Sequence, residues 1–273
     1  MFDDVFNALL ARLERRADRQ YAVAPVCAAP MATADEYRRL WDDAKGRAYP
    51  PIDELERAFG ARIDPAWLHD LALLTQITIK RSELCYQHGR VLYAMVARFI
   101  RDRVHRDLTI VETGTARGFS GLCMAKALDD GNASGKILSC DVIPHDVSIF
   151  WNCIKDTEGP RSRAELLVDY AALLERFMIF HRGDSRRELA HMSVPRIHIA
   201  VLDSVHTYEH VLAEFASIRG RQQSGDLLFF DDYTPEAYPG VVRAADEICD
   251  GFAYTKTVVT ASPGRCYVIA EKH

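Results

Sequence analysis

The stretch that decides the fold runs from Leu108 to Gly121 and reads Leu-Thr-Ile-Val-Glu-Thr-Gly-Thr-Ala-Arg-Gly-Phe-Ser-Gly. An apolar run over 108–112 leads into a glycine-rich turn, and a helical stretch over 118–128 follows the turn. A glycine-rich turn between a strand and a helix is typical of folds that bind nucleotide cofactors. The spacing here is G-x-x-x-G-x-x-G, which differs from the G-x-G-x-x-G of dinucleotide binders.

The acidic residue before this turn narrows the class of ligand. The Glu112 carboxylate would repel a pyrophosphate seated on the helix N-terminus, whereas it would attract a cationic ligand. S-adenosylmethionine carries a sulfonium and an ammonium group and has no phosphate. The turn therefore favours S-adenosylmethionine over a dinucleotide, and the alternative is that its glycines serve only a tight turn.

Downstream of the turn, short apolar runs alternate with helical stretches. The further runs are nearly continuous in hydrophobicity, as in parallel strands buried on both faces, and cover 137–141, 177–181, 197–203 and 226–230. The last two strands, 253–260 and 265–271, flank Ser262-Pro263-Gly264 and should form a hairpin. We therefore predict an α/β fold with a doubly wound, mostly parallel, seven-stranded Rossmann-like sheet, whose ligands bind at the carboxyl ends of the strands.

The intervening helices are expected at 118–128, 163–176, 208–219 and 236–249. The chain before residue 107 reads as helices alone, at 2–19, 34–46, 52–59, 65–74 and 82–104. Asp64 is expected to cap the helix that opens with Pro65. We therefore expect two regions: a helical N-terminal extension over 1–106, serving as a lid or in oligomerisation, and a cofactor-binding α/β domain over 107–273.

Composition excludes several classes of protein. The formal net charge of −5 in 273 residues argues against a nucleic-acid partner, which requires clustered Lys and Arg. The acidic start of the chain does not resemble a signal peptide, and no apolar run approaches the ~20 residues of a membrane span. The seven cysteines are odd in number and dispersed. These features favour a reduced cytoplasmic protein with no membrane partner.

The ends of the second and third strands carry polar groups that suit an adenosine-containing ligand. An acid at the position of Asp141 commonly binds ribose hydroxyls. Gly183 would let the backbone approach a flat base, and Asp184 or Ser185 would hydrogen-bond its amino edge. The alternative for Asp184 and Ser185 is that one of them only caps the following helix.

Three carboxylates follow the fourth and fifth strands. Because neighbouring parallel strands lie ~4.8 Å apart, Asp203 should lie beside Asp231 and Asp232. Three converging carboxylates repel one another unless a cation joins them, and an all-oxygen set suits Mg²⁺, with Mn²⁺ as the second choice. The alternative is that these acids cap helices or face water.

Taken in order, these motifs resemble the class I S-adenosylmethionine-dependent methyltransferases. Within that class they are similar to the metal-dependent O-methyltransferases of the macrocin and catechol types, over about residues 85–271. The resemblance implies that S-adenosylmethionine would be bound by Glu112, Thr113, Gly114, Thr115, Gly118, Ser120, Asp141, Gly183, Asp184 and Ser185. It also implies that Asp203, Asp231 and Asp232 would hold Mg²⁺ or Mn²⁺.

The sequence departs from the catechol type at two positions. Those relatives have an Asn where this chain has Asp232, and a Lys where it has His206. His206, or Asp203 itself, would therefore take the proton from the acceptor during methyl transfer.

The implied acceptor is a small-molecule hydroxyl on a natural-product sugar, a polyketide or a phenol. A metal-independent N-methyltransferase of the same fold and a non-catalytic binding protein stay open as alternatives. A homo-oligomer formed through 1–106, in the simplest case a dimer, is a further expectation.

Overall fold

The structure is a computed structural model that describes residues 27–103 and 107–273. The described chain forms two compact units. The first contains residues 27–48, Asp64–Tyr86 and Pro144–Asp169, and the second contains Tyr49–Ile63, Gln87–Ile143 and Tyr170–His273. The expected helix over 2–19 lies outside the described residues. The division between the units does not follow the expected boundary at residue 107, because segments of 1–106 belong to both.

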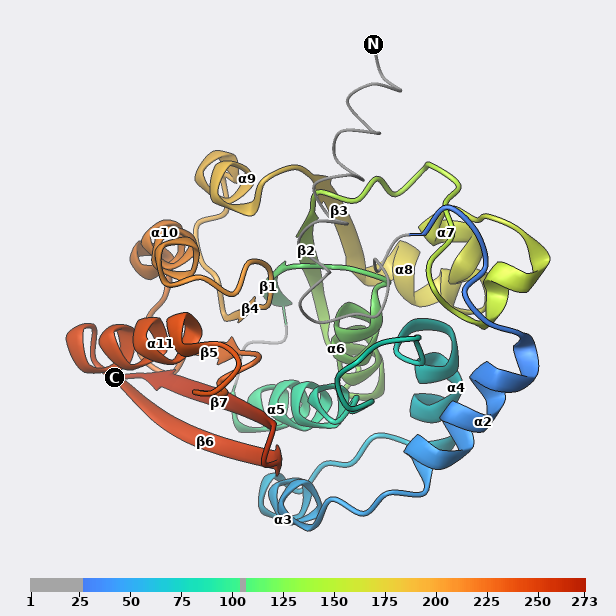
Figure 1. Cartoon of the computed structure of the whole chain (residues 1–273). Helices are drawn as coiled ribbons and strands as arrows, with labels where there is room; N and C mark the ends of the chain where they lie inside the picture. The colour runs from blue at the N-terminus through green and yellow to red at the C-terminus, as the bar shows by residue number, and fades with distance from the viewer. Residues whose placement is uncertain (1–26, 104–106) are drawn as a thin grey trace. The chain divides into compact units, whose positions relative to one another are not determined.

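The second unit is built on one seven-stranded sheet in the order β3-β2-β1-β4-β5-β7-β6 (Figure 1). The strands are β1 Asp107–Thr113, β2 Ser134–Asp141, β3 Met178–Arg182, β4 Ile199–Leu202, β5 Leu227–Phe230, β6 Tyr254–Ser262 and β7 Arg265–Lys272. The first five run parallel, while β7 runs antiparallel to both β5 and β6. The doubly wound, mostly parallel sheet is thus confirmed, and the carboxyl ends of β1 to β5 share one edge.

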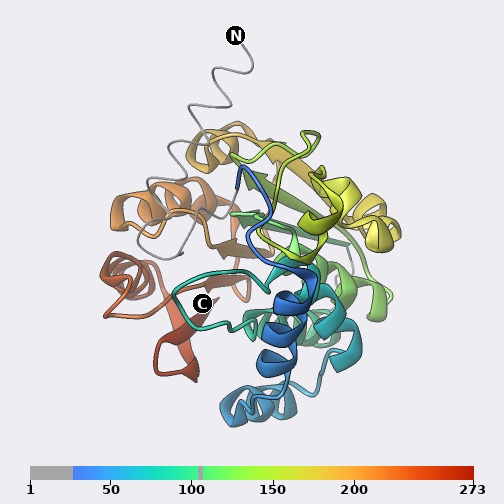
Figure 2. The same ribbon diagram turned by 45° about the vertical axis from the view of Figure 1, so that its right-hand side comes forward.

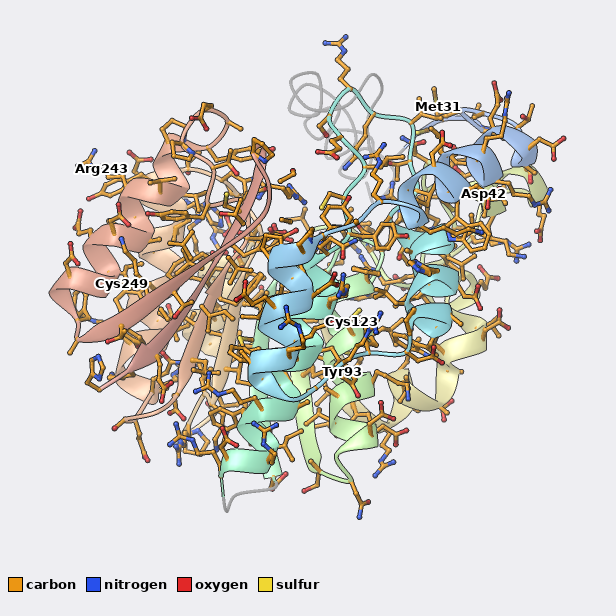
Figure 3. The ribbon with its side chains drawn as sticks, turned by 90° about the horizontal axis from the view of Figure 1, so that it is seen from below. Met31, Asp42, Tyr93, Cys123, Arg243 and Cys249 are labelled. Atoms are coloured by element: carbon orange, nitrogen blue, oxygen red, sulfur yellow. The ribbon has the colours of Figure 1, made fainter. Side chains whose placement is uncertain are left out.

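Helices cover both faces of this sheet (Figure 2). One face carries α5 (His88–Asp102), α6 (Phe119–Asp130) and α8 (Ala171–Phe177), with α3 (Pro50–Phe59) beside α5 and β6. The other face carries α9 (Ser185–His191), α10 (Tyr208–Ile218) and α11 (Pro239–Gly251). Figure 3 labels Tyr93 of α5 and Cys123 of α6, which belong to the first face, and Arg243 and Cys249 of α11, which belong to the other. Burial of β1, β2, β4 and β5 on both faces explains why they read as continuous apolar runs.

The first unit contains α2 (Ala34–Lys45), α4 (Pro65–Thr75), α7 (Arg163–Leu166) and the 3₁₀ helix η1 (Ile154–Glu158). Its segments are joined by Asn152, whose amide oxygen accepts from the Tyr37 hydroxyl and from the backbone N–H of Ile79, both at 3.0 Å. As expected, Asp64 caps α4 by accepting from the N–H of Ala66 at 2.9 Å.

Three helical expectations differ from the structure. The helix expected over 82–104 begins only at His88. The stretch 163–176 is divided into α7, the 3₁₀ helix η2 (Val168–Tyr170) and α8, and the chain passes from the first unit to the second within it. The short α9 was not expected as a helix, although Asp184 was considered as a cap.

None of the seven cysteines, all of which lie within the described residues, forms a disulfide bond. Among the described residues, the helices are too short or too polar for any of them to cross a membrane.

Candidate active site

The turn between β1 and α6 is shaped by glycines in the left-handed region of backbone space. Gly114 has φ +89° and Gly118, the residue before α6, has φ +91°. A Cβ atom on Gly114 would lie 2.1 Å from the backbone oxygen of Asp203, so this position also permits the close approach of β1 to β4. Thr113 holds the same junction, because its backbone oxygen accepts from the N–H of Asp203 at 3.1 Å.

Asp141, at the end of β2, fastens this turn to the sheet. One of its carboxylate oxygens accepts from the N–H of Ala116 at 2.6 Å and the other from the N–H of Ile143 at 2.8 Å. The residue is only 8% exposed. Asp141 therefore holds the turn after β1 against the end of β2.

Glu112 lies beneath the turn and is fully buried. The hydroxyls of Ser120 on α6 and Ser139 on β2 both donate to its carboxylate. The Ser139 oxygen also lies 2.6 Å from the hydroxyl of Thr115 in the turn. Glu112 therefore fixes the turn from inside through two serines, and its contribution to a cationic ligand is the negative charge that it places under the turn.

The residues after β3 are divided between the surface and the interior. Asp184 caps α9 and pairs with Arg186 through both carboxylate oxygens. The hydrogen bond from Arg186 lowers the pKa of Asp184 to about 2. Ser185 is buried and donates to Glu214 of α10 at 2.5 Å, with His210 at 3.0 Å. The structure thus uses Asp184 as the helix cap that the sequence offered as an alternative.

Three polar side chains converge where β4 and β5 end. The Nε2 atom of His206 lies 3.2 Å from Oδ1 of Asp203 and 3.2 Å from Oδ2 of Asp232. One ligand atom from each of the three lies within 4.8 Å of those of the other two. The ring of Tyr238 packs on the His206 ring with centroids 4.7 Å apart. We call Asp203, His206 and Asp232 the strand-end cluster.

Asp231 lies beside this cluster and is held separately. Its Oδ1 accepts from the N–H of Asp232 at 2.8 Å, and its Oδ2 lies 3.8 Å from Arg265 of β7. Arg265 also pairs with Oδ1 of Asp232. The sequence did not single out Arg265, because a lone Arg after a hairpin turn has no local signal. Only the pairing of β7 with β5 brings it to this edge.

The charges at this edge act strongly on one another. Burial, followed by the nearby charge of Asp231, raises the pKa of Asp203 well above its usual value. Burial alone would lower the pKa of His206, but the hydrogen bond to Asp203 and the charge of Asp232 outweigh it, so this pKa is raised. Burial alone would raise the pKa of Asp231, but the Arg265 guanidinium holds it below its usual value. Perturbed ionisable groups at strand ends are typical of functional sites.

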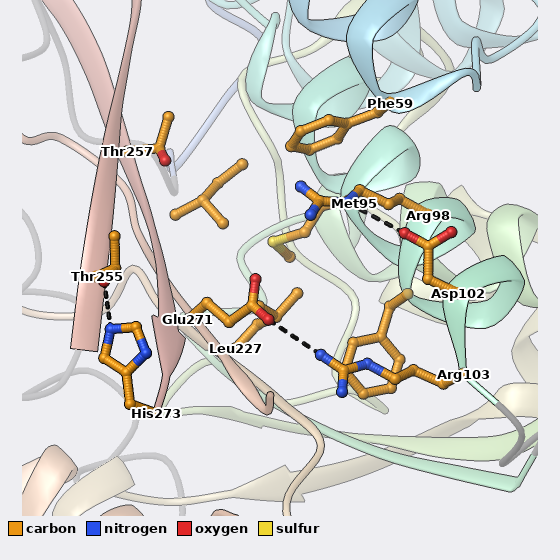
Figure 4. A pocket seen from close by; sticks show the side chains of 12 residues that line it. Phe59, Met95, Arg98, Asp102, Arg103, Leu227, Thr255, Thr257, Glu271 and His273 are labelled. Atoms are coloured by element: carbon orange, nitrogen blue, oxygen red, sulfur yellow. Dashed lines mark hydrogen bonds and ion pairs between the residues drawn. The ribbon is translucent and has the colours of Figure 1, made fainter. Parts of the chain in front are cut away.

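A separate cavity of about 390 Å³ lies where β5 begins, beside α5 (Figure 4). Its apolar wall includes Phe59 and Phe99, which are covered by the guanidinium groups of Arg98 and Arg103. Those two groups pair with Asp102 and Glu271. The charges of these two arginines are therefore balanced without a ligand, and the cavity belongs to the opposite edge of the sheet from the strand-end cluster.

Comparisons with known proteins agree with this architecture. Residues 111–233 match the model of a family described as a methyltransferase domain. The solved O-methyltransferase from Bacillus cereus in complex with SAH has a TM-score of 0.51 at 15% identity, and the match covers 88% of this chain and 98% of that one. TomG from Streptomyces achromogenes, an O-methyltransferase involved in tomaymycin synthesis and solved with SAM, gives 0.52 at 15% identity, covering 77% and 91%.

Cofactor-bound Rv0187 from MTB gives a TM-score of 0.54 at 16% identity, covering 77% of this chain and 90% of that one. No curated protein matches the sequence. Identities this low concern the fold, and the fold agrees with the family match over the segment from β1 to Tyr233. The seven-stranded sheet and the match over residues 111–233 together indicate a methyltransferase domain within this chain.

Proposed function

We propose that this protein is a class I S-adenosylmethionine-dependent methyltransferase that acts on a hydroxyl group of a small molecule with the help of a divalent cation. The observation that carries the proposal is the strand-end cluster, in which Asp203, His206 and Asp232 offer converging ligand atoms. Two carboxylates and an imidazole suit Mn²⁺ as well as Mg²⁺, because imidazole is a softer ligand than oxygen. The donor set therefore fits a divalent cation, with Asp231 supplying further negative charge beside it.

S-adenosylmethionine would supply the electrophilic methyl group. We assign its ribose to Asp141 and its methionine part to the turn of Thr113, Gly114, Thr115 and Gly118, above the charge of Glu112, to which Ser120 donates a hydrogen bond. Gly183, Asp184 and Ser185 are assigned to the adenine end, where Gly183 would contribute backbone and the two side chains would shape α9. The place of Asp141 at the end of β2, bonded to the N–H of Ala116 in the turn, and the left-handed glycines of the turn support this assignment.

Replacing Asp141 by Ala should weaken binding of S-adenosylhomocysteine by about tenfold or more, because two hydrogen-bond acceptors are lost and the turn is released from β2. Isothermal titration calorimetry measures the affinity for S-adenosylhomocysteine. Asp107→Ala, at the exposed start of β1, is the matched control and should bind normally. An unchanged affinity in Asp141→Ala would refute the ribose assignment.

When bound, a divalent cation would lower the pKa of an acceptor hydroxyl and stabilise its negative charge. Asp203 and Asp232 would hold the cation. His206 would either complete the ligand set or take the proton of the acceptor, and Asp203 is the alternative base. Tyr238 orients the His206 ring by packing on it. Alignment of the two substrates at this edge would supply much of the rate enhancement.

A metal-independent methyltransferase is the second candidate, and one observation favours it. Arg265 already places a cation against Asp232 and Asp231. Treatment with EDTA separates the two candidates. We expect activity to fall to background and to return with Mg²⁺ or Mn²⁺, while S-adenosylhomocysteine still binds. Activity that survives EDTA and ignores added ions would favour the second candidate.

A sugar, polyketide or phenolic natural product is the proposed acceptor class. The role of TomG in tomaymycin synthesis supports this class by analogy of fold alone. A cytoplasmic location, a homodimer through residues 1–106 and the absence of nucleic-acid and membrane partners stay predictions of the sequence. Complete failure to bind S-adenosylhomocysteine would point instead to a non-catalytic protein that keeps the fold.

A further inference from the structure

Arg265 is the first residue of β7 and reaches the edge where β5 ends. The antiparallel pairing of Phe230 with Val268 brings the start of β7 beside the residues after β5. The N–H of Tyr233 donates to the backbone oxygen of Cys266 at 2.9 Å, which continues this pairing past the end of β5. The position of Arg265 is therefore set by the sheet itself.

The Arg265 guanidinium lies near both carboxylates that follow β5. On Asp232, Oδ1 pairs with Arg265 while Oδ2 faces His206 in the strand-end cluster. On Asp231, Oδ2 lies 3.8 Å from the same guanidinium. Asp232 adopts φ +55°, an unfavourable backbone region for a residue with a side chain. Arg265 thus helps to hold Asp232 with one oxygen presented to the cluster.

Arg265 also changes the charge of the site. Asp203, Asp231 and Asp232 bring up to three negative charges into a largely buried space, where like charges repel strongly. The Arg265 side chain is only 17% exposed, so its own charge is weakly screened by solvent. A guanidinium stays charged under all ordinary conditions. The acids therefore have a permanent partner that neither dissociates nor loses a proton.

We propose that Arg265 is an internal counter-cation that keeps the strand-end cluster folded without a divalent ion and, by its charge, weakens the binding of that ion. This inference rests on the proposed divalent site. If Arg265 has this role, the divalent ion exchanges with solvent and is not needed for folding. Arg265 is a positioning residue, because it acts on the site through Asp231 and Asp232.

Two substitutions separate the effect of the charge of Arg265 from the effect of its geometry. Arg265→Gln removes the charge, whereas Arg265→Lys keeps the charge and loses the planar fork. Mn²⁺ affinity, followed by the electron paramagnetic resonance signal of free Mn²⁺, should rise at least about tenfold in Arg265→Gln, since a charge at this range shifts proton affinity about 10- to 1000-fold. Arg265→Lys should stay within about threefold of the wild type, because its charge remains.

The melting temperature gives a readout that does not depend on activity. EDTA should lower it in Arg265→Gln by about 3 °C more than in the wild type, because the ion then replaces the missing cation. Arg196→Gln is the matched control. It breaks the pair with the buried Asp226, just before β5, so it should lower the melting temperature by the same amount with and without EDTA. Arg265→Gln, if unstable, can be purified in Mn²⁺ and measured after dialysis.

The outcomes distinguish this inference from the proposed function. Equal Mn²⁺ affinity in the wild type and Arg265→Gln would overturn the role of Arg265 and leave the divalent site intact. If Arg265→Lys bound Mn²⁺ more tightly than the wild type and as tightly as Arg265→Gln, the argument from charge would be overturned. The divalent site would again stay intact. Failure of all three proteins to bind Mn²⁺ would overturn the divalent site, and this inference with it.

Discussion

Asp232→Ala is expected to reduce kcat by about 100-fold or more while leaving the affinity for S-adenosylhomocysteine within about twofold, because it removes an acceptor-side ligand of the cation and no cofactor contact. Asp232 is 3% exposed and connects His206 on one oxygen with Arg265 on the other. Steady-state kinetics at saturating Mg²⁺ together with calorimetry measures both quantities.

Asp232→Asn is the conservative comparison. It keeps one oxygen for the cation, and Asn is the residue that the resemblance to the catechol type implies at this position. We expect a loss of about tenfold or less, in line with the modest effects of changes that preserve a ligand atom. If Asn and Ala at position 232 lowered kcat equally, ligation by the side-chain oxygen would be ruled out as the cause.

Asp231→Ala tests which carboxylates belong to the ligand set. The sequence predicts Asp203, Asp231 and Asp232 together, whereas the converging atoms in the structure come from Asp203, His206 and Asp232. Asp231 is bonded to the N–H of Asp232 and lies near Arg265. We therefore expect Asp231→Ala to lower kcat less than Asp232→Ala does and to lower the melting temperature more. An equal loss of kcat would favour the set of three carboxylates.

The sequence predicted the sheet well for a physical reason. β1, β2, β4 and β5 are buried as they approach the functional edge, and a strand buried on both faces must be apolar there. The edge strand β3 is the exception, with Ile179 39% exposed. Each such run, Leu227–Phe230 for example, ends at a polar residue that marks the functional edge. The candidate site could be predicted to the extent that its residues lie at or just after those ends, as Asp141, Asp203 and Asp232 do.

The rest of the site depends on contacts that no local pattern encodes. Arg265 reaches Asp232 across 33 residues of sequence, and only strand pairing brings the two together. Ser139 lies inside β2 and reads as an ordinary strand residue, yet it bonds to Glu112 of the neighbouring strand. The helix expected over 163–176 is interrupted at Val168–Tyr170, where the chain leaves one compact unit for the other. Helical periodicity carries no signal for such a crossing.

Gly114→Ala is expected to abolish measurable binding of S-adenosylhomocysteine and to destabilise the second unit. The left-handed φ of +89° alone costs an Ala about 1–2 kcal/mol. The added Cβ would also lie 2.1 Å from the backbone oxygen of Asp203, so main chain must move, and no side-chain rotation relieves the contact. This movement would push the turn after β1 away from the end of β4. It would therefore break the contact between the cofactor-binding turn and Asp203.

Gly220→Ala is the matched control, because that glycine has open space around its Cβ position and lies in the same unit. We expect its affinity and its urea midpoint to match those of the wild type. Gly114→Ala should lose at least about 2 kcal/mol in unfolding free energy, since strain and collision add. Normal binding by Gly114→Ala would show that β1 and β4 tolerate a wider separation, and it would remove the structural link between the cofactor turn and the strand-end cluster.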